Sequence, residues 1–224
     1  MILGLAAPAR AEEFYYVLVF ASQQAPARRI VPSHTFATFV KATGCGPCAD
    51  NYQLEAHTIS WMPQTLNLRP AALLPEPGQN LGLDATFQWA LATGQRLSLW
   101  GPYQIDRSLY ERAMHQIAVL ESGQVQYKMI DTGFPVSRVS NCIHAVGTLA
   151  GSHYLEAVNR SFGETASYHV LRRFEPWIID SCRKHSWILD RMGLRGYPVI
   201  ERDWENPRSG VLMGPISAIL GKER

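Results

Sequence analysis

The sequence has few cysteines, little net charge and no long hydrophobic run, and each of these absences excludes a class of protein. Four cysteines in 224 residues are too few for a disulfide scaffold. The 21 basic side chains nearly balance the 19 acidic ones, so the net charge of +2 favours neither a nucleic-acid partner nor an anionic membrane. No stretch approaches the roughly 20 apolar residues of a membrane-spanning helix. The sequence has no glycine-rich phosphate loop and no serine nucleophile elbow. We expect no cofactor.

The composition and the length predict one folded domain. Hydrophobic residues make up 46% of the chain and charged residues 18%, which is ordinary for a globular protein. We expect a domain over 12–224, with 1–11 as a possible signal-peptide remnant because Ala9-Arg10-Ala11 has the small-x-small form of a cleavage site. This predicts a periplasmic or secreted protein. If 1–11 is instead a plain apolar N-terminus, the protein is cytoplasmic. No feature of the sequence bears on the oligomeric state.

The order of the expected elements favours an α+β fold. Runs of aromatic and β-branched residues predict strands over 14–21, 34–41, 52–62, 96–100 and 125–131. Helices are predicted over 86–93, 108–121, 142–149, 166–174 and 177–192, the second of them capped by Asp106. Pro and Gly between 64 and 84 indicate a loop. Strands followed by helices are typical of an antiparallel sheet packed against helices.

The most conspicuous motif is Cys45-Gly46-Pro47-Cys48, a redox motif of thioredoxins. It follows a predicted strand, as that fold requires. A thioredoxin-like site also needs a helix directly after the second cysteine, to lower the pKa of the first thiol. The residues after Cys48 are rich in strand formers. The alternative is a hairpin tip whose cysteines are incidental or joined in a small disulfide.

Two histidines flank this turn. His34 and His57 are 23 residues apart, with the midpoint between Cys45 and Gly46. If 34–41 and 52–62 pair as a hairpin about that midpoint, the two imidazoles face each other on one side of the sheet, about 5 Å apart at Cβ. Such a pair needs partners for its ring nitrogens, or a chemical purpose.

Cys142 is a candidate nucleophile because of its position. It follows Ser140 and Asn141, which suit a helix N-cap, and it precedes an apolar helical stretch. The first turn of a helix lowers a thiol pKa and offers N–H donors to a developing oxyanion, here the Cys142 amide with the Asn141 side chain. A nearby histidine would act as the base. Two helical steps turn His144 by roughly 200°, so we do not expect it to be that partner.

These residues resemble a known group. Asn141-Cys142-Ile143-His144-Ala145-Val146 is similar to the Asn-Cys-x-His-x-Val signature of the lecithin retinol acyltransferase-like proteins, circularly permuted relatives of the NlpC-type papain-like hydrolases. In that group a catalytic histidine on a strand comes first, as His34 does, a second histidine on the next strand orients it, as His57 would, and the cysteine comes last. The resemblance covers 14–150 and implies a permuted papain-like sheet or half-barrel, with 151–224 as a helical extension.

Taken together, the sequence favours a cysteine hydrolase or acyltransferase with a Cys142–His34–His57 triad. The substrate would be a small peptide or an acyl-bearing molecule, and the attack on an amide or ester would give a thioester. A dithiol oxidoreductase using Cys45 and Cys48 is the alternative from another enzyme class. An inactive papain-like domain used for binding is a third hypothesis. Zinc binding is less favoured, because the histidines and Cys142 lack the close pairing of structural zinc sites.

Overall fold

The computed structural model describes residues 11–24, 33–45, 51–70, 72–135, 137–151, 163–206 and 210–213. The strands in these ranges are β1 (Glu12–Gln24), β2 (His34–Gly44), β3 (Gln53–Ile59), β4 (Trp61–Pro63), β5 (Glu76–Asn80), β6 (Gln95–Ile105), β7 (Gln126–Tyr127), β8 (Val139–Ser140), β9 (Val199–Arg202) and β10 (Gly210–Leu212). The α-helices are α1 (Leu83–Ala92), α2 (Arg107–Glu121), α3 (Cys142–Gly147), α5 (Gly163–Arg173) and α6 (Trp187–Arg191), and the 3₁₀ turns are η2 (Thr148–Ala150), η4 (Glu175–Trp177) and η5 (Leu194–Gly196). The possible signal remnant lies outside the described residues, apart from Ala11.

The main sheet joins both ends of the described chain. Its strand order is β10-β9-β6-β1-β2-β3, with antiparallel neighbours except for the parallel pair β6 and β9. A smaller sheet has the order β4-β5-β7-β8. The α+β class is therefore confirmed, with antiparallel-rich sheets packed against helices.

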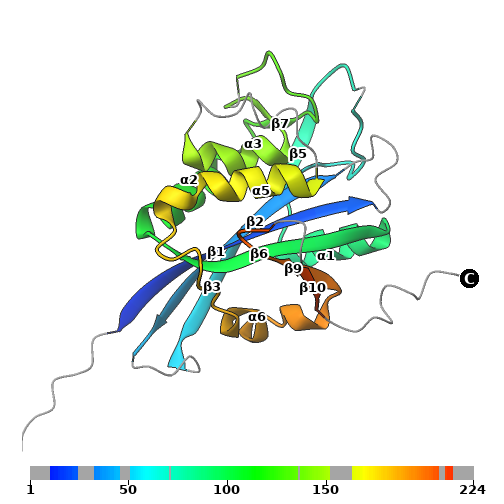
Figure 1. Cartoon of the computed structure of the whole chain (residues 1–224). Helices are drawn as coiled ribbons and strands as arrows, with labels where there is room; N and C mark the ends of the chain where they lie inside the picture. Colours follow the sequence, from blue (N-terminus) through cyan, green and yellow to red (C-terminus); the bar gives the residue numbers. More distant parts are fainter. Residues whose placement is uncertain are drawn as a thin grey trace, which may run out of the picture.

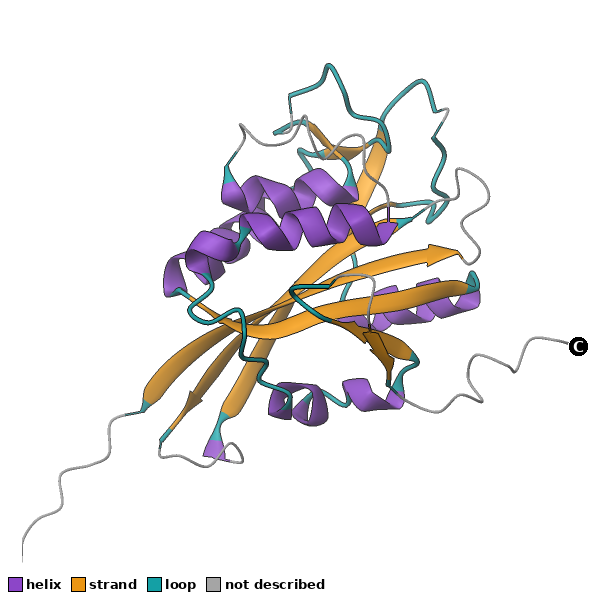
Figure 2. Ribbon diagram, viewed as in Figure 1, coloured by secondary structure: helices purple, strands orange, loops and turns teal. Residues whose placement is uncertain are grey.

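Helices cover both faces of the main sheet. Helices α2, α3 and α5 lie on one face, and α1 and α6 lie on the other (Figure 1; Figure 2). Val17, Val19 and Phe39 point into the first core, and Leu18, Phe20 and Phe36 into the second. Because both faces are buried, β1 is a continuous apolar run rather than an alternating one. The sequence predicted this strand and its burial correctly.

Several expected elements end elsewhere because their backbone bonds go to other partners. The predicted strand 52–62 breaks at Ser60, whose amide donates to the Asn80 side chain and whose carbonyl accepts from Leu81. The chain passes there from one sheet to the other. Ile178 and Ile179 are not helical, because this part of the chain bonds alongside the end of β6. The segment 151–224 also supplies β9 and β10, so it is not the purely helical extension that we expected.

Candidate functional site

Cys142 opens α3, as the sequence predicted. Asn141 is the N-cap of this helix, and its side-chain oxygen accepts from the His144 amide at 2.8 Å. The Cys142 side chain is buried. The backbone amides of Thr35 and Ile143 face its sulfur and act to lower the pKa of the thiol. The start of α3 therefore touches the start of β2, and the thiol lies against the peptide group that joins His34 to Thr35.

The thiol is not the activated thiolate that the helix position predicted. Burial raises the pKa of Cys142 to about 11, because the charged sulfur would lose its hydration. The backbone amides of Thr35 and Ile143 act in the opposite direction but do not compensate, and the carboxylate of Asp131 raises the pKa further. At neutral pH the side chain is a neutral thiol, which corrects the expectation of a lowered pKa.

His34 is the first residue of β2 and is fully buried. Its Nε2 lies 2.8 Å from the Ser60 hydroxyl, and its ring packs against Phe36 and the edge of Trp89. The other ring nitrogen, Nδ1, is buried and has no hydrogen-bond partner among the described residues. Burial lowers the pKa of His34 to about 3, so the imidazole is neutral at physiological pH.

A chain of hydroxyls supports the His34 ring. The Thr86 hydroxyl lies 2.8 Å from Ser60 Oγ and 2.9 Å from the Gly82 carbonyl. The Thr86 hydroxyl donates to Ser60 Oγ, which can also accept from His34 when the imidazole proton is on Nε2. In that tautomer Nδ1 is unprotonated, with a lone pair available to take up a proton.

His57 does not join this cluster. β2 and β3 form the expected hairpin, but the register pairs His57 with Phe39 and Ile59 with Ala37. The expected register is thus wrong by five residues, and an odd shift moves a side chain to the opposite face. His57 lies with Phe39 on the face covered by α2, whereas His34 lies with Phe36 on the other face. The Nε2 of His57 is 2.7 Å from Glu55 on the surface.

A second buried polar cluster surrounds Asp131, which the sequence left unassigned. One of its oxygens lies 2.5 Å from His144 Nδ1 and accepts from the Asn141 amide, and the other accepts from Asn141 Nδ2. Asn141 Nδ2 also donates to the Met129 carbonyl. Because both of its amide hydrogens are used, Asn141 holds the helix start rather than serving an oxyanion. This corrects its expected role, since the oxyanion would find no free donor there.

A thioredoxin-like site needs a helix after its second cysteine, and the described residues beyond the cysteine pair do not form one. Cys45 is a free, exposed cysteine, and Cys48 lies outside the described residues. The residues that follow form β3 from Gln53 to Ile59. Among the described residues that follow Cys48, the chain is already extended from Gln53 onward, so they do not form the helix that a thioredoxin-like site has there, and they do not support the dithiol hypothesis.

Comparison with family models, curated proteins and solved structures finds no match to the chain. Within the described ranges, no three His, Cys, Asp or Glu side chains are placed to hold a metal ion. In the same part of the chain, no helix is long and apolar enough to cross a membrane.

Replacing Asp131 by alanine should destabilise the fold by about 3 to 5 kcal/mol, because it leaves buried donors of Asn141 and His144 without an acceptor. Urea unfolding measures this difference. Asp84, which is exposed on α1, is the matched control, and D84A should change stability by less than about 0.5 kcal/mol. Equal effects of the two variants would contradict the role given to the Asp131 cluster.

The buried neutral state of His34 predicts a specific pH dependence of stability. In the unfolded chain the imidazole binds a proton below pH 6.5, but in the folded protein only near pH 3. Stability is therefore full above pH 6.5 and falls as the pH approaches 3. Between pH 7.5 and 4.5, His34→Gln should lose about 3 kcal/mol less than the wild type. His115→Gln, at an exposed position, should follow the wild type, whereas parallel curves for all three would contradict a neutral buried His34.

Proposed function

We propose that this chain is a thiol hydrolase or acyltransferase that acts on an amide or ester bond. Cys142 is the nucleophile, His34 is the general base, and Ser60 takes the orienting role first given to His57. The observation that carries the proposal is that the Thr35 amide faces the Cys142 sulfur and follows His34 in the chain, a buried histidine whose Nδ1 has no partner among the described residues. The His34 side chain itself lies with Phe36 on the other face of β2 from α3. The resemblance to the permuted papain-like proteins points to the same cysteine and the same first histidine.

The proposed reaction starts from a neutral thiol and a neutral imidazole. As sulfur bonds to the carbonyl carbon of the substrate, its proton moves to Nδ1 of His34. The imidazolium then gives this proton to the leaving amine or alcohol as the carbon–leaving-group bond breaks, and a thioester remains on Cys142. Water or another acceptor attacks the thioester and frees the thiol. Ser60 holds the imidazole in the tautomer that this sequence needs.

A non-catalytic binding domain is the second candidate, and one observation favours it. The pKa of Cys142 is raised rather than lowered, as for an ordinary buried cysteine, whereas papain-like thiols are activated before the substrate binds. The catalytic proposal therefore requires that proton transfer accompany the attack.

Acylation by p-nitrophenyl acetate distinguishes the two candidates. After acid quenching and peptide mapping, the catalytic proposal predicts one acetyl thioester on Cys142. Acetyl groups found only on the exposed thiols of Cys45 or Cys182, or a chain without any acetyl group, would contradict it.

A further inference from the structure

The outer edge of β3 is an unoccupied strand edge in the described part of the protein. β3 is the last strand of the main sheet on its side, next to β2. The Thr58 carbonyl accepts from Asn80 Nδ2 at 2.9 Å, and the Ser60 amide donates to Asn80 Oδ1 at 2.8 Å. The Asn80 amide thus occupies the place of one residue of a further strand. Because hydrogen-bonding directions alternate along a strand, the N–H and C=O of Ala56 point to the same outer side as those of Thr58.

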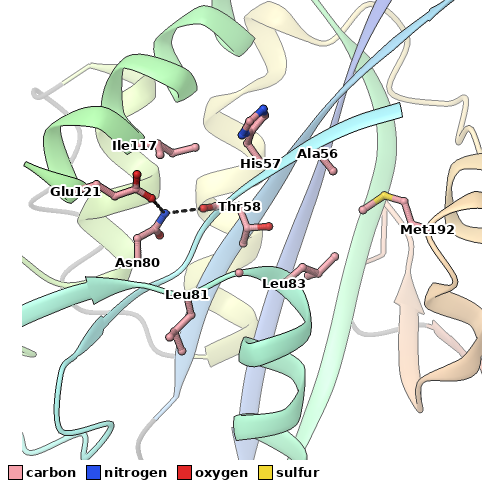
Figure 3. A pocket seen from close by; sticks show the side chains of 10 residues that line it. Ala56, His57, Thr58, Asn80, Leu81, Leu83, Ile117, Glu121 and Met192 are labelled. Carbon is pink, nitrogen blue, oxygen red and sulfur yellow. Dashed lines mark hydrogen bonds between the residues drawn. The ribbon is translucent and has the colours of Figure 1, made fainter. Parts of the chain in front are cut away.

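A pocket of about 230 Å³ lies over this edge. It runs from α2 above the edge to the start of α1 below it, with Met192 closing one side (Figure 3). Ile117, Leu83 and Met192 give it apolar walls. These walls and the free backbone groups of Ala56 suit an extended chain whose side chain enters the pocket.

The polar end of the pocket is acidic. Among the described residues that line the pocket, Glu121 is the only acidic one and none is a lysine or an arginine. The Glu121 carboxylate accepts from Asn80 at 3.1 Å. Glu55 adds a second exposed carboxylate on the same edge strand. An aliphatic stem ending in a cation matches apolar walls with a carboxylate at the end.

We propose that the outer edge of β3 binds a peptide in extended conformation and that the pocket between α1 and α2 takes a lysine or arginine side chain of that peptide. β3 leads directly to Ser60, which contacts His34. A bound peptide would therefore enter the candidate site along this strand. This last consequence rests on the proposed function, whereas binding at the edge does not.

Fluorescence anisotropy with a labelled, end-blocked Thr-Val-Lys-Val-Thr peptide tests the proposal on the full chain carrying Cys142→Ala, which prevents any covalent reaction. The peptide should bind, and the Thr-Val-Glu-Val-Thr peptide should bind at least about tenfold more weakly. Methylation of alternate backbone amides of the lysine peptide should abolish binding, because it removes the donors needed for strand pairing.

Matched variants locate the site. Glu121→Gln keeps an acceptor for Asn80 but removes the charge, and should weaken lysine-peptide binding about tenfold. Glu111→Gln, on the exposed side of the same helix, should leave it unchanged. Ala56→Pro removes the outward N–H that an edge strand does not need for its own sheet, and should also weaken binding. Equal binding of the lysine and glutamate peptides, or no effect of N-methylation, would overturn the proposal.

The two proposals fail separately. Peptide binding without any acylation of Cys142 would leave the edge-strand site standing and contradict the catalytic function. Acylation of Cys142 in a protein that binds none of the peptides would do the reverse.

Discussion

Replacing Cys142 by alanine is expected to lower turnover of p-nitrophenyl acetate by a factor of about 10⁴ to 10⁶, the range in which removal of a catalytic nucleophile falls. Cys142 is the thiol that touches the strand carrying His34, through the Thr35 amide. Alanine removes the atom that forms the thioester but leaves the N-cap of α3 intact, because the cap uses Asn141. The fold should therefore survive, and steady-state hydrolysis with an unfolding curve measures both effects.

Cys182→Ala is the matched control, since Cys182 is free and exposed. Its turnover should equal that of the wild type. If the Cys142 and Cys182 variants hydrolyse the ester equally fast, Cys142 is an ordinary buried residue.

Replacing His34 by glutamine should lower the same turnover by about 10² to 10⁴, the contribution of a positioned general base. Glutamine can still bond to Ser60, so the hydroxyl chain to Thr86 keeps a partner, but no group remains to accept the thiol proton. The loss should be the same at every pH between 5 and 8, because the buried imidazole is neutral throughout, with a pKa of about 3. A variant as active as the wild type would contradict the role of His34.

Two alanine variants test whether Ser60, rather than His57, orients the His34 imidazole. Ser60→Ala removes one hydrogen bond from His34 Nε2 and should lower turnover about tenfold. His57→Ala should change it by less than about twofold, because His57 contacts Glu55 at the surface and has no contact with His34 or Ser60 among the described residues. Combining Ser60→Ala with His34→Gln should cost no more than His34→Gln alone. A larger effect of His57→Ala than of Ser60→Ala would restore the triad expected from the sequence.

Elements with strong local signals could be predicted. The apolar run that forms β1 and the pairing of β2 with β3 follow from residue type, and Asp106 caps α2 by accepting from the Ser108 amide. Asn141 likewise caps α3. A helix cap is decided by neighbouring residues, and a run of apolar strand formers carries its own signal even though its partner strands lie elsewhere in the chain.

Elements that depend on distant partners could not be predicted. β9 spans only Val199–Arg202 and pairs with β6 about 100 residues earlier, so its own sequence carries little signal. The hairpin register is another case. The turn is not centred on the midpoint between the histidines, and Thr43 pairs with Gln53, which moves every later pair.

The candidate site likewise has one part that could be predicted from neighbouring residues and another that depends on distant contacts. The position of Cys142 at a helix start follows from its neighbours. The hydroxyl of Ser60 meets His34 only because the chain changes sheets there, and Asp131 finds Asn141 and His144 only through the loop after β7. No spacing or motif in the sequence predicts either contact. Asp131 and His144 are polar residues in apolar segments, however, and this indicates that they are buried with hydrogen-bond partners.

The most direct test of the proposed chemistry compares native and unfolded chains that keep Cys142 as their single cysteine, with Cys45, Cys48 and Cys182 replaced by serine. The rate of acetylation of Cys142 by p-nitrophenyl acetate is measured at one pH in buffer and in urea. We predict faster acetylation in the native protein, because His34 takes the thiol proton during the attack. Slower acetylation in the native protein than in the unfolded chain would show a buried, inert thiol and contradict the catalytic role of Cys142.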